Sequence, residues 1–471
     1  MRANGSHRRD GPEHVTPYDR FAFNDVDIER LLLTGDYRRE LVAYFGEQEY
    51  RELVELAHRS QANGAGGSGM PAIIVPGIMG SQLGLVRPQP LPNDILWLDP
   101  IDIQIGRLEA LRLEEQTSIV SLGVVLYSHL RLKLHLRAGG FAPVFHDYDW
   151  RLGVDSLGKT LAERICRMES RNVAIVAHSM GGLVTRAALT HPGAEKVERA
   201  ILLGTPNFGS FAAVQALRGT YAVVRKIARL SNASSAENLA GEIFNSFPSL
   251  YHMLPHGDCS GGADLFAAAA WPQTGPRPRG DLLQRARGLR DQLAHADERL
   301  SAIVGVGQET VTGVARRRDD FVYTVTRRGD GTVPAVSAAL PGVRSYYTPL
   351  AHSELTRDRN VAAAVIDLLK HGDTDKLPAK WQSHTAAEAR ISDTQLRRTH
   401  AQKVDWAGLE PEERRIFLQN LNEPPKLRLR VPAAAGHAAA SSRAQPAKAR
   451  RSPRARTAAR STERSRPSKH R

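Results

Sequence analysis

Short apolar runs alternate with longer amphipathic stretches through the middle of the chain. Four runs predict buried strands, at 72–75 (AIIV), 143–145 (PVF), 173–177 (VAIVA) and 200–203 (AILL). Apolar positions three and four residues apart predict helices over 125–139, 156–169 and 182–190. Further strands are predicted at 302–306 and 321–326, and a helix at 360–370. Strands that alternate with helices indicate a mostly parallel sheet covered by helices on both faces.

The segments around this core have other patterns. Residues 1–69 predict an N-terminal extension that is polar and irregular to 35, helical over 36–60 with an interruption at Gly46, and a Gly-rich linker over 61–69. Residues 211–300 are Ala-rich and helical, with no clear strand. Residues 371–424 predict a polar, weakly helical extension, and the Ala/Arg/Ser/Pro-rich residues 425–471 predict a disordered tail.

The charge of the chain is concentrated in this tail. The 471 residues have a formal net charge of +14, and 425–471 contain fourteen Lys or Arg and one acid, which is +13. The other residues therefore sum to +1, and their apolar content is ample for a globular core. A wholly disordered or fibrous protein is excluded. The tail is either an inert, solvated segment or a segment that binds a polyanion, with an anionic membrane favoured over nucleic acid.

The cysteine count and the hydropathy narrow the class of protein further. Cys166 and Cys259 cannot form a disulfide framework, and no Cys/His spacing indicates zinc, so we expect two free thiols and no metal or cofactor. No run of 18 apolar residues and no signal-peptide pattern is present. These features predict a cytoplasmic protein, peripheral to a membrane if the tail binds one. Its oligomeric state is left open.

The strongest chemical signal is VAIVAHSMGGL at 173–183, a buried strand that runs into Ser179 with a helix behind it. This is the G-x-S-x-G nucleophile elbow with Ala177 in place of the first glycine. Small residues two before and two after the serine let strand and helix pack closely around a strained turn. The turn predicts Ser179 as a nucleophile, with the Met180 backbone N–H as a donor to an oxyanion.

A serine nucleophile requires a base and an acid, which this architecture supplies downstream in the order acid, then base. Asp330 lies in GDGT after the strand predicted at 321–326, and His352 lies in LAHSE before the last helix. Asp358 and His371 are the nearest rivals, although Asp358 is placed to cap that helix and His371 lies beyond it. The loop PGIMGS at 76–81 predicts the Ile78 N–H as the second oxyanion donor.

Seven motifs occur in order along residues 70–370, and together they resemble the lecithin:cholesterol acyltransferase family of α/β-hydrolase enzymes. They are VPGIMGSQL (75–83), YDWRL (148–152), AHSMGGLV (177–184), LLGTPNFGS (202–210), FPSLYHMLP (247–255), GDGTVP (329–334) and AHSEL (351–355). The resemblance implies an α/β-hydrolase catalytic domain over 70–370, with a lid at about 84–130 and a cap at about 211–300. It implies Ser179, Asp330 and His352 as catalytic residues, and Ile78 and Met180 as oxyanion donors.

Two features depart from the family's pattern. Neither cysteine lies in the predicted lid, which secreted members staple with a disulfide, and the apolar Ile78 allows only a backbone role where some members have an acidic residue. Trp97 fits a lid aromatic and a buried core residue equally well. Asp149 and Arg151 are better explained as a structural ion pair beside Trp150 than as functional groups.

The sequence therefore predicts an acyl-ester hydrolase or O-acyltransferase that acts on lipid esters through an acyl-enzyme. Whether water or an alcohol accepts the acyl group is left open. The alternative is a non-catalytic protein on a hydrolase scaffold that binds anionic membrane or nucleic acid through its tail. An intact set of three catalytic positions argues against the alternative.

Overall fold

A computed structural model describes residues 15–16, 18–19, 24–64, 69–113, 118–382, 387–398 and 403–421 of the chain. The basic tail predicted at 425–471 lies outside these residues. Within them, no helix is both long and apolar enough to cross a membrane.

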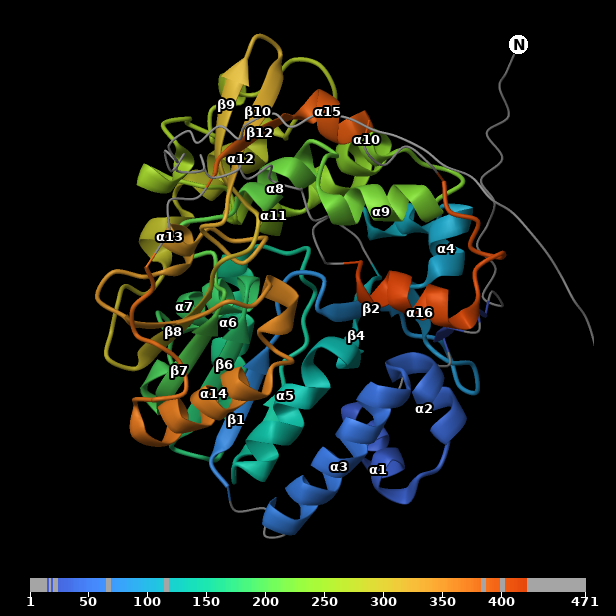
Figure 1. The fold of residues 1–471 in the computed structure, drawn as a ribbon, viewed down its shortest axis with the longest axis vertical. Coiled ribbons are helices and arrows are strands. Elements are labelled where there is room, and N and C mark those ends of the chain that lie inside the picture. Colours follow the sequence, from blue (N-terminus) through green and yellow to red (C-terminus); the bar gives the residue numbers. More distant parts are fainter. Residues whose placement is uncertain are drawn as a thin grey trace, which may run out of the picture. The chain divides into compact units, whose positions relative to one another are not determined.

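The centre of the structure is a six-stranded parallel sheet in the order β11-β8-β7-β6-β1-β5 (Figure 1). Its strands are β1 Pro71–Val75, β5 Ala142–Phe145, β6 Val173–His178, β7 Val197–Leu203, β8 Leu300–Gly305 and β11 Arg344–Thr348. Five of them confirm predicted strands, and β11 was not predicted because its sequence, RSYYT, has no apolar run. The sheet confirms the predicted α/β fold class.

Helices cover both faces of this sheet, as the uninterrupted apolar strands require. Helices α6 Val154–Arg167 and α7 Met180–Ala188 pack on one face, and α5 Leu126–Ala138 and α14 Arg359–His371 pack on the other. Successive strand residues point to opposite faces, so Ile73 joins the core beneath α6 and α7 while Ile74 joins the core beneath α5 and α14. These four helices confirm the periodicity seen in the sequence.

Three N-terminal helices extend the second of these cores. They are α1 Asp25–Thr34, α2 Arg38–Phe45 and α3 Glu47–Gly64, and α3 packs along α5. The helical stretch predicted over 36–60 divides at Gly46, whose φ of 88° ends α2. The prediction of an irregular segment to 35 is wrong over α1, where Asn24 caps a helix that buries Leu31 and Leu32.

The chain between β1 and β5 contains strands that the sequence did not predict. Strands β2 Ser81–Leu85, β3 Asp94–Trp97 and β4 Val120–Val124 form an antiparallel sheet in the order β3-β2-β4. A helix, α4 Pro100–Ile105, and a 3-10 turn, η2 Arg107–Leu111, follow β3. Each strand has only four or five residues with polar members, so its pattern is too short to separate from a loop.

The region predicted as a helical cap, 211–300, is helical up to β8. Its elements are α8 Phe211–Leu217, α9 Ala222–Leu230, α10 Ala236–Asn238, η4 Leu239–Ile243, η5 Phe244–Ser246, α11 Pro248–His252, η6 Gly257–Ser260, η7 Ala268–Ala270, α12 Gly280–Arg287 and η8 Leu289–Gln292. The short turn η3 Ala194–Lys196 precedes β7, and α13 Ala335–Ala338 and η9 His352–Glu354 flank β11.

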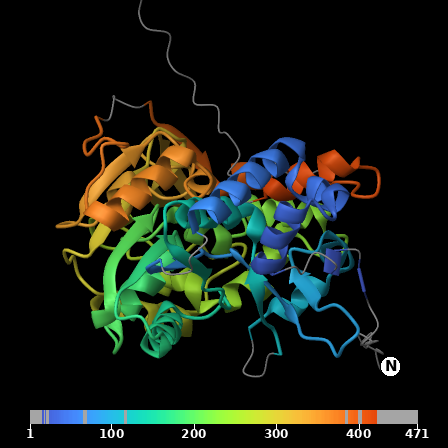
Figure 2. The same ribbon diagram turned by 90° about the horizontal axis from the view of Figure 1, so that it is seen from below.

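A third, antiparallel sheet has the order β12-β10-β9 and consists of β9 Thr310–Arg317, β10 Asp320–Thr326 and β12 Ala389–Ser392. The strand predicted at 321–326 is therefore real but lies outside the central sheet. Segment 387–421, predicted as weakly helical, supplies β12 and two helices, α15 Asp393–Arg398 and α16 Pro411–Gln419. Helix α16 lies beside α2 (Figures 1 and 2).

Candidate active site

Ser179 occupies the sharp turn between β6 and α7, with φ 54° and ψ −126°. This conformation is unfavourable for any residue except glycine, so it is held by its surroundings. The Ser179 N–H donates to the Leu203 carbonyl at 2.8 Å, and the Ser179 carbonyl accepts from the Gly182 N–H at 3.0 Å. A Cβ at Gly181 would lie 2.5 Å from the carbonyl oxygens of Val75 and Pro76, so only glycine allows α7 to approach β1.

Asp330 and His352 are brought together at the carboxyl ends of β7 and β8. His352 Nδ1 lies 2.7 Å from Asp330 Oδ2, and the His352 N–H donates to the Asp330 carbonyl at 2.8 Å. The Asp330 Oδ1 accepts from the N–H groups of Thr332 (2.9 Å) and Val333 (2.6 Å). Because a carboxylate only accepts, this arrangement puts the hydrogen on Nδ1 and leaves Nε2 free to take a proton.

A close approach of backbone makes room for this pair. A Cβ on Gly204 would lie 3.0 Å from His352 Nδ1 and 3.1 Å from Asp330 Oδ2, and Gly204 has a φ of +55°. The Asp330 side chain is 1% exposed and that of His352 12%. The two rivals have structural places instead, since Asp358 caps α14 by accepting from the Asn360 and Val361 N–H groups, and His371 is the last residue of α14.

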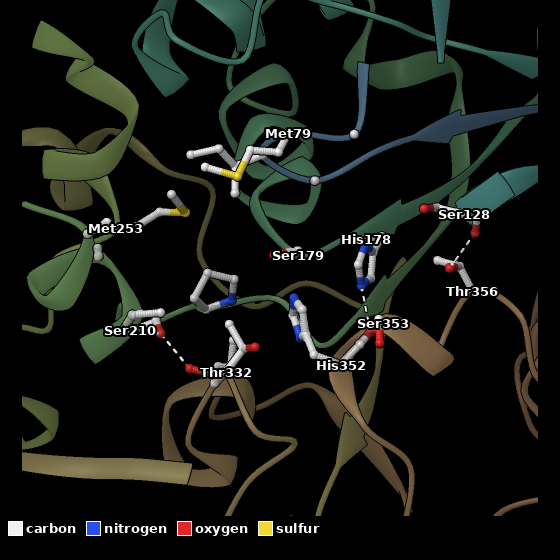
Figure 3. A pocket seen from close by; sticks show the side chains of 18 of the residues that line it. Met79, Ser128, His178, Ser179, Ser210, Met253, Thr332, His352, Ser353 and Thr356 are labelled. Atoms are coloured by element: carbon white, nitrogen blue, oxygen red, sulfur yellow. Dashed lines mark hydrogen bonds between the residues drawn. The ribbon is translucent and has the colours of Figure 1, made fainter. Parts of the chain in front are cut away.

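Ser179 and His352 face one cavity (Figure 3). The loop after β1 forms another part of its wall, and a Cβ at Gly77 in this loop would lie 2.8 Å from the Cβ of Ser179. Met79 has a φ of 63°, and its carbonyl accepts from the Trp97 Nε1–H at 3.2 Å. Trp97 is fully buried and contacts Trp150 edge to face, so of its two interpretations the core residue is correct.

The two predicted oxyanion donors belong to different elements, Ile78 to the loop after β1 and Met180 to the first turn of α7. Ile78 lines the cavity, whereas the Met180 side chain is fully buried and only its backbone starts α7. The first N–H groups of a helix have no acceptor inside the helix, so the start of α7 suits a negatively charged oxygen.

The predicted structural role of Asp149 and Arg151 is confirmed. Arg151 is fully buried, its Nη2 lies 2.7 Å from Asp149 Oδ2, and its Nη1 donates to the Leu111 carbonyl. The Trp150 Nε1–H donates to the Ser81 carbonyl at 3.0 Å, which fixes β2 beside the strand-end loop. Cys166 and Cys259 are not joined by a disulfide.

Sequence reasoning missed one histidine beside the predicted base. The His178 Nε2 lies 3.0 Å from the His352 carbonyl oxygen, and the two rings lie 4.7 Å apart. Burial, with His352 and His129 nearby, holds the pKa of His178 well below its usual range, so its ring is neutral. A neutral ring donates to the carbonyl and positions the loop of His352. Its only signal in the sequence is its place inside the elbow motif.

The residues described contain no group of three or more His, Cys, Asp or Glu side chains arranged to hold a metal ion. The site combines a serine in a strained turn, an imidazole that is hydrogen-bonded to a carboxylate, and the N-terminal N–H groups of a helix. These are the parts needed for acyl transfer through a covalent intermediate.

One of the comparisons with known proteins matches a family of enzymes. A family model described as lecithin:cholesterol acyltransferase matches residues 144–279. No curated protein matches the chain.

Solved structures similar to the chain include a lipase and a two-protein complex. The Bacillus licheniformis lipase BlEst2 in its mature form is 14% identical, with 65% of this chain and 93% of that chain covered and a TM-score of 0.34. In its propeptide form it is 15% identical with 67% of this chain covered and a TM-score of 0.34, and the match spans about half (51%) of that longer chain. The Tle4–Tli4 complex is 15% identical over 64% of this chain and 98% of that chain, with a TM-score of 0.37.

Residues 144–279 contain β6, Ser179 and much of the helical region after β7, and four of the seven collinear motifs lie in full within this range. The match over this range confirms the resemblance found in the sequence to the lecithin:cholesterol acyltransferase family.

Proposed function

We propose that the chain is a serine-dependent acyl-ester hydrolase or O-acyltransferase that acts on lipid esters. The observation that carries the proposal is the 2.7 Å contact between His352 and Asp330 at the cavity that also contains the strained Ser179. The family match over 144–279 supports the same chemistry. No cofactor enters the reaction.

In the proposed mechanism, Ser179 Oγ attacks the ester carbonyl while His352 Nε2 takes the hydroxyl proton. Asp330 holds the imidazole and stabilises the positive charge that forms on it. The carbonyl oxygen becomes an oxyanion that accepts from the Ile78 and Met180 N–H groups. The intermediate collapses, the alcohol leaves with the proton of His352, and the acyl group stays on Ser179. Water or a second alcohol then releases it by the same steps.

The cavity supports an apolar acyl group. Its walls include Met79, Leu250, Met253 and the small side chains of Ala212, Ala213 and Ala216. Several of these come from α8 and the residues around α11, which belong to the predicted cap. Unbranched, polarisable methionine side chains adapt to flexible apolar chains.

A fluorophosphonate probe tests the nucleophile directly. The full chain should be labelled at one serine, and Ser179→Ala and His352→Ala should both prevent labelling, whereas His371→Ala should be labelled like the parent. Absence of labelling in the folded parent would favour the alternative of a non-catalytic scaffold protein. Product analysis with a phospholipid, with and without a long-chain alcohol, then separates hydrolysis from transacylation.

A further inference from the structure

The cavity around Ser179 has two chemically different ends. One end is mostly apolar and includes Met79, Met253 and Leu250. The other is polar and is formed by α5, the turn after η9 and the end of α16, with Tyr127, Ser128, His129, Thr356, Arg357 and Gln419 in its wall. Figure 3 shows Met79 and Met253 on one side of Ser179 and His352, and Ser128 and Thr356 on the other. We call the second side the polar end.

His129 is the side chain of the polar end whose hydrogen bonding is least complete. It is 2% exposed, and neither of its ring nitrogens completes a hydrogen bond with a residue that the structure describes. Burial lowers the pKa of His129 to about 4, and the carbonyl of Val125, one turn earlier, opposes that shift only in part. That carbonyl can pair with only one of the two nitrogens. The neutral ring therefore retains a hydrogen-bonding nitrogen for a ligand, and a buried unpaired nitrogen is costly.

Arg357 contributes a second unsatisfied group. Its Nη1 donates to Tyr127 Oη at 2.9 Å and its Nη2 to Glu49 Oε2 at 3.1 Å, while its buried Nε has no hydrogen-bond partner among the residues described. The Tyr127 hydroxyl in turn donates to the Gln419 carbonyl at 3.2 Å. These contacts fix the guanidinium and leave one N–H directed to no acceptor.

The charge around Arg357 is already balanced. Glu49 also lies 2.7 Å from Arg131, which is 2.6 Å from Glu52. Two arginines thus face two glutamates, and no net positive charge remains for a phosphate. A plain alkyl group would leave both His129 and the Arg357 Nε unpaired. A neutral group with several hydroxyls can donate to and accept from the imidazole and also accept from Nε.

We propose that the polar end binds a neutral polyhydroxyl alcohol, as the leaving group of the ester or as the acceptor of its acyl chain. The proposal rests on the function proposed above and names the class of its second substrate. In the transfer step, a hydroxyl oxygen of the polyol attacks the acyl carbonyl and its proton passes to His352 Nε2. The bond between Ser179 Oγ and the acyl carbon breaks, and that proton returns to Ser179.

The test is a competition for the acyl-enzyme formed from p-nitrophenyl butyrate. Glycerol, 1-propanol and glycerol 3-phosphate are offered separately at equal concentration, and the glyceride, propyl ester, phosphoglyceride and free acid are quantified. With two hydrogen bonds to gain, glycerol should accept the acyl group about tenfold more efficiently than 1-propanol. It should also exceed glycerol 3-phosphate. Equal use of glycerol and 1-propanol, or a preference for the phosphate, would overturn the proposal.

Variants connect this preference to the polar end. His129→Leu and Arg357→Lys, the second of which keeps the charge opposite Glu49, should each reduce the ratio of glyceride to propyl ester severalfold. His129→Gln should restore part of it, because an amide both donates and accepts. His135→Leu is the matched control, since His135 lies on the same helix outside the cavity wall and should leave the ratio unchanged. An unchanged ratio in both His129 and Arg357 variants would also overturn the proposal.

The readouts separate this proposal from the proposed function. Release of p-nitrophenol that depends on Ser179 reports the acyl-enzyme, and the ratio of products reports the polar end. Release without a preference for glycerol overturns only the polyol site. Absence of Ser179-dependent release overturns the proposed function and the polyol site with it. The comparison of alcohols with the parent protein requires no variant, so it stands even if a substitution impairs folding.

Discussion

The backbone conformation of Ser179 lowers the stability of the fold and places the hydroxyl for the proposed reaction. The φ of 54° costs stability in a serine, while the same turn lifts the hydroxyl toward the cavity. Ser179→Ala should therefore reduce ester turnover by about 10⁴–10⁶-fold and leave stability nearly unchanged, since alanine keeps the strain. Ser179→Gly should abolish turnover and raise the free energy of unfolding by about 1 kcal/mol. Urea denaturation and p-nitrophenyl ester kinetics measure both, and a loss of turnover of only a few tenfold would exclude Ser179.

Asp330 and Asp358, the two candidates for the acid, provide a matched pair of variants. Asp330→Asn should keep the geometry and reduce turnover by about 10⁴-fold, because the amide favours the wrong tautomer of the imidazole. Asp358→Asn should leave turnover within a few fold, since an asparagine can still accept from the two N–H groups at the start of α14. The opposite result would reassign the acid to Asp358.

Local sequence was enough to propose these residues because each proposed catalytic position lies in a short motif of fixed geometry. The contacts of His129, His178 and Arg357 could not be predicted from the sequence. His129 and Arg357 are separated by more than two hundred residues, and nothing in their own neighbourhoods indicates that one cavity wall contains both. They share this wall because α5, which contains His129, packs beside the turn between η9 and α14, which contains Arg357.

At the scale of elements, continuous apolar runs and helical periodicity predicted strands and helices correctly. The short strands that contain polar residues, β2, β3 and β4, were not predicted. The runs at β1, β6 and β7 are buried on both faces, so their apolar content is continuous. Strand β10 shows the limit of this reasoning, because its pattern predicts a strand but not which sheet it joins. Asp330 nevertheless reaches the end of the central sheet, where a Cβ on Gly305 of β8 would lie 2.6 Å from the Cβ of Asp330.

The segment 387–398 is attached to the helical region after β7 by a buried ion pair. Arg218 Nε lies 2.8 Å from Asp393 Oδ2, both side chains are fully buried, and the Tyr323 hydroxyl donates to Asp393 Oδ1 at 2.7 Å. Arg218→Met should lower the free energy of unfolding by about 3–5 kcal/mol, because it removes the nearest positive charge from the buried Asp393 and leaves only Arg397, at 3.9 Å, opposite it. Arg167→Met removes the exposed pair with Glu163 and should change it by less than about 0.5 kcal/mol. Equal small effects in urea denaturation would contradict this account.

At the scale of the whole molecule, buried imidazoles should set the response to acid. Burial lowers the pKa of His129 and His146 to about 4, below the 6.5 expected of an unfolded chain. The unfolded state then binds more protons below pH 6.5, so the stability that these residues contribute is complete above that pH and falls toward pH 4. Burial raises the pKa of Asp99 to about 6, which has the opposite sign over the same range.

When the pH falls from 7 to 5, His129 and His146 each lower the free energy of unfolding by up to about 2 kcal/mol, whereas Asp99 raises it by about 1.4 kcal/mol. Burial also lowers the pKa of His135 to about 4 and that of His178 well below its usual range, so both add to the loss, and we expect the free energy of unfolding to fall by more than about 2 kcal/mol over this range. Urea denaturation at the two pH values measures the difference, and His146→Gln should make it smaller. A protein that is more stable at pH 5 would show that Asp99 dominates.

The predicted tail gives a test of membrane association, a proposal that rests on its sequence. Residues 425–471 have a net charge of +13 beside a nearly neutral remainder. Deleting them should spare hydrolysis of a soluble short-chain ester and reduce binding to anionic vesicles at low salt. The difference should vanish near 0.5 M salt, where the Debye length is about 4 Å. Equal vesicle binding by both proteins at low salt would exclude the membrane role and leave nucleic acid to be tested.

The cavity wall is closed by residues made at very different times during translation. Gln419 of α16 contacts the carbonyls of Tyr44 and Phe45, and its own carbonyl accepts from Tyr127. A nascent chain that has reached α7 contains the proposed nucleophile, yet it lacks the proposed base on η9 and the part of the wall that α16 supplies. The proposed chemistry therefore requires a chain that includes η9, and the complete cavity wall requires α16, so shorter chains on the ribosome should not attack the esters around them.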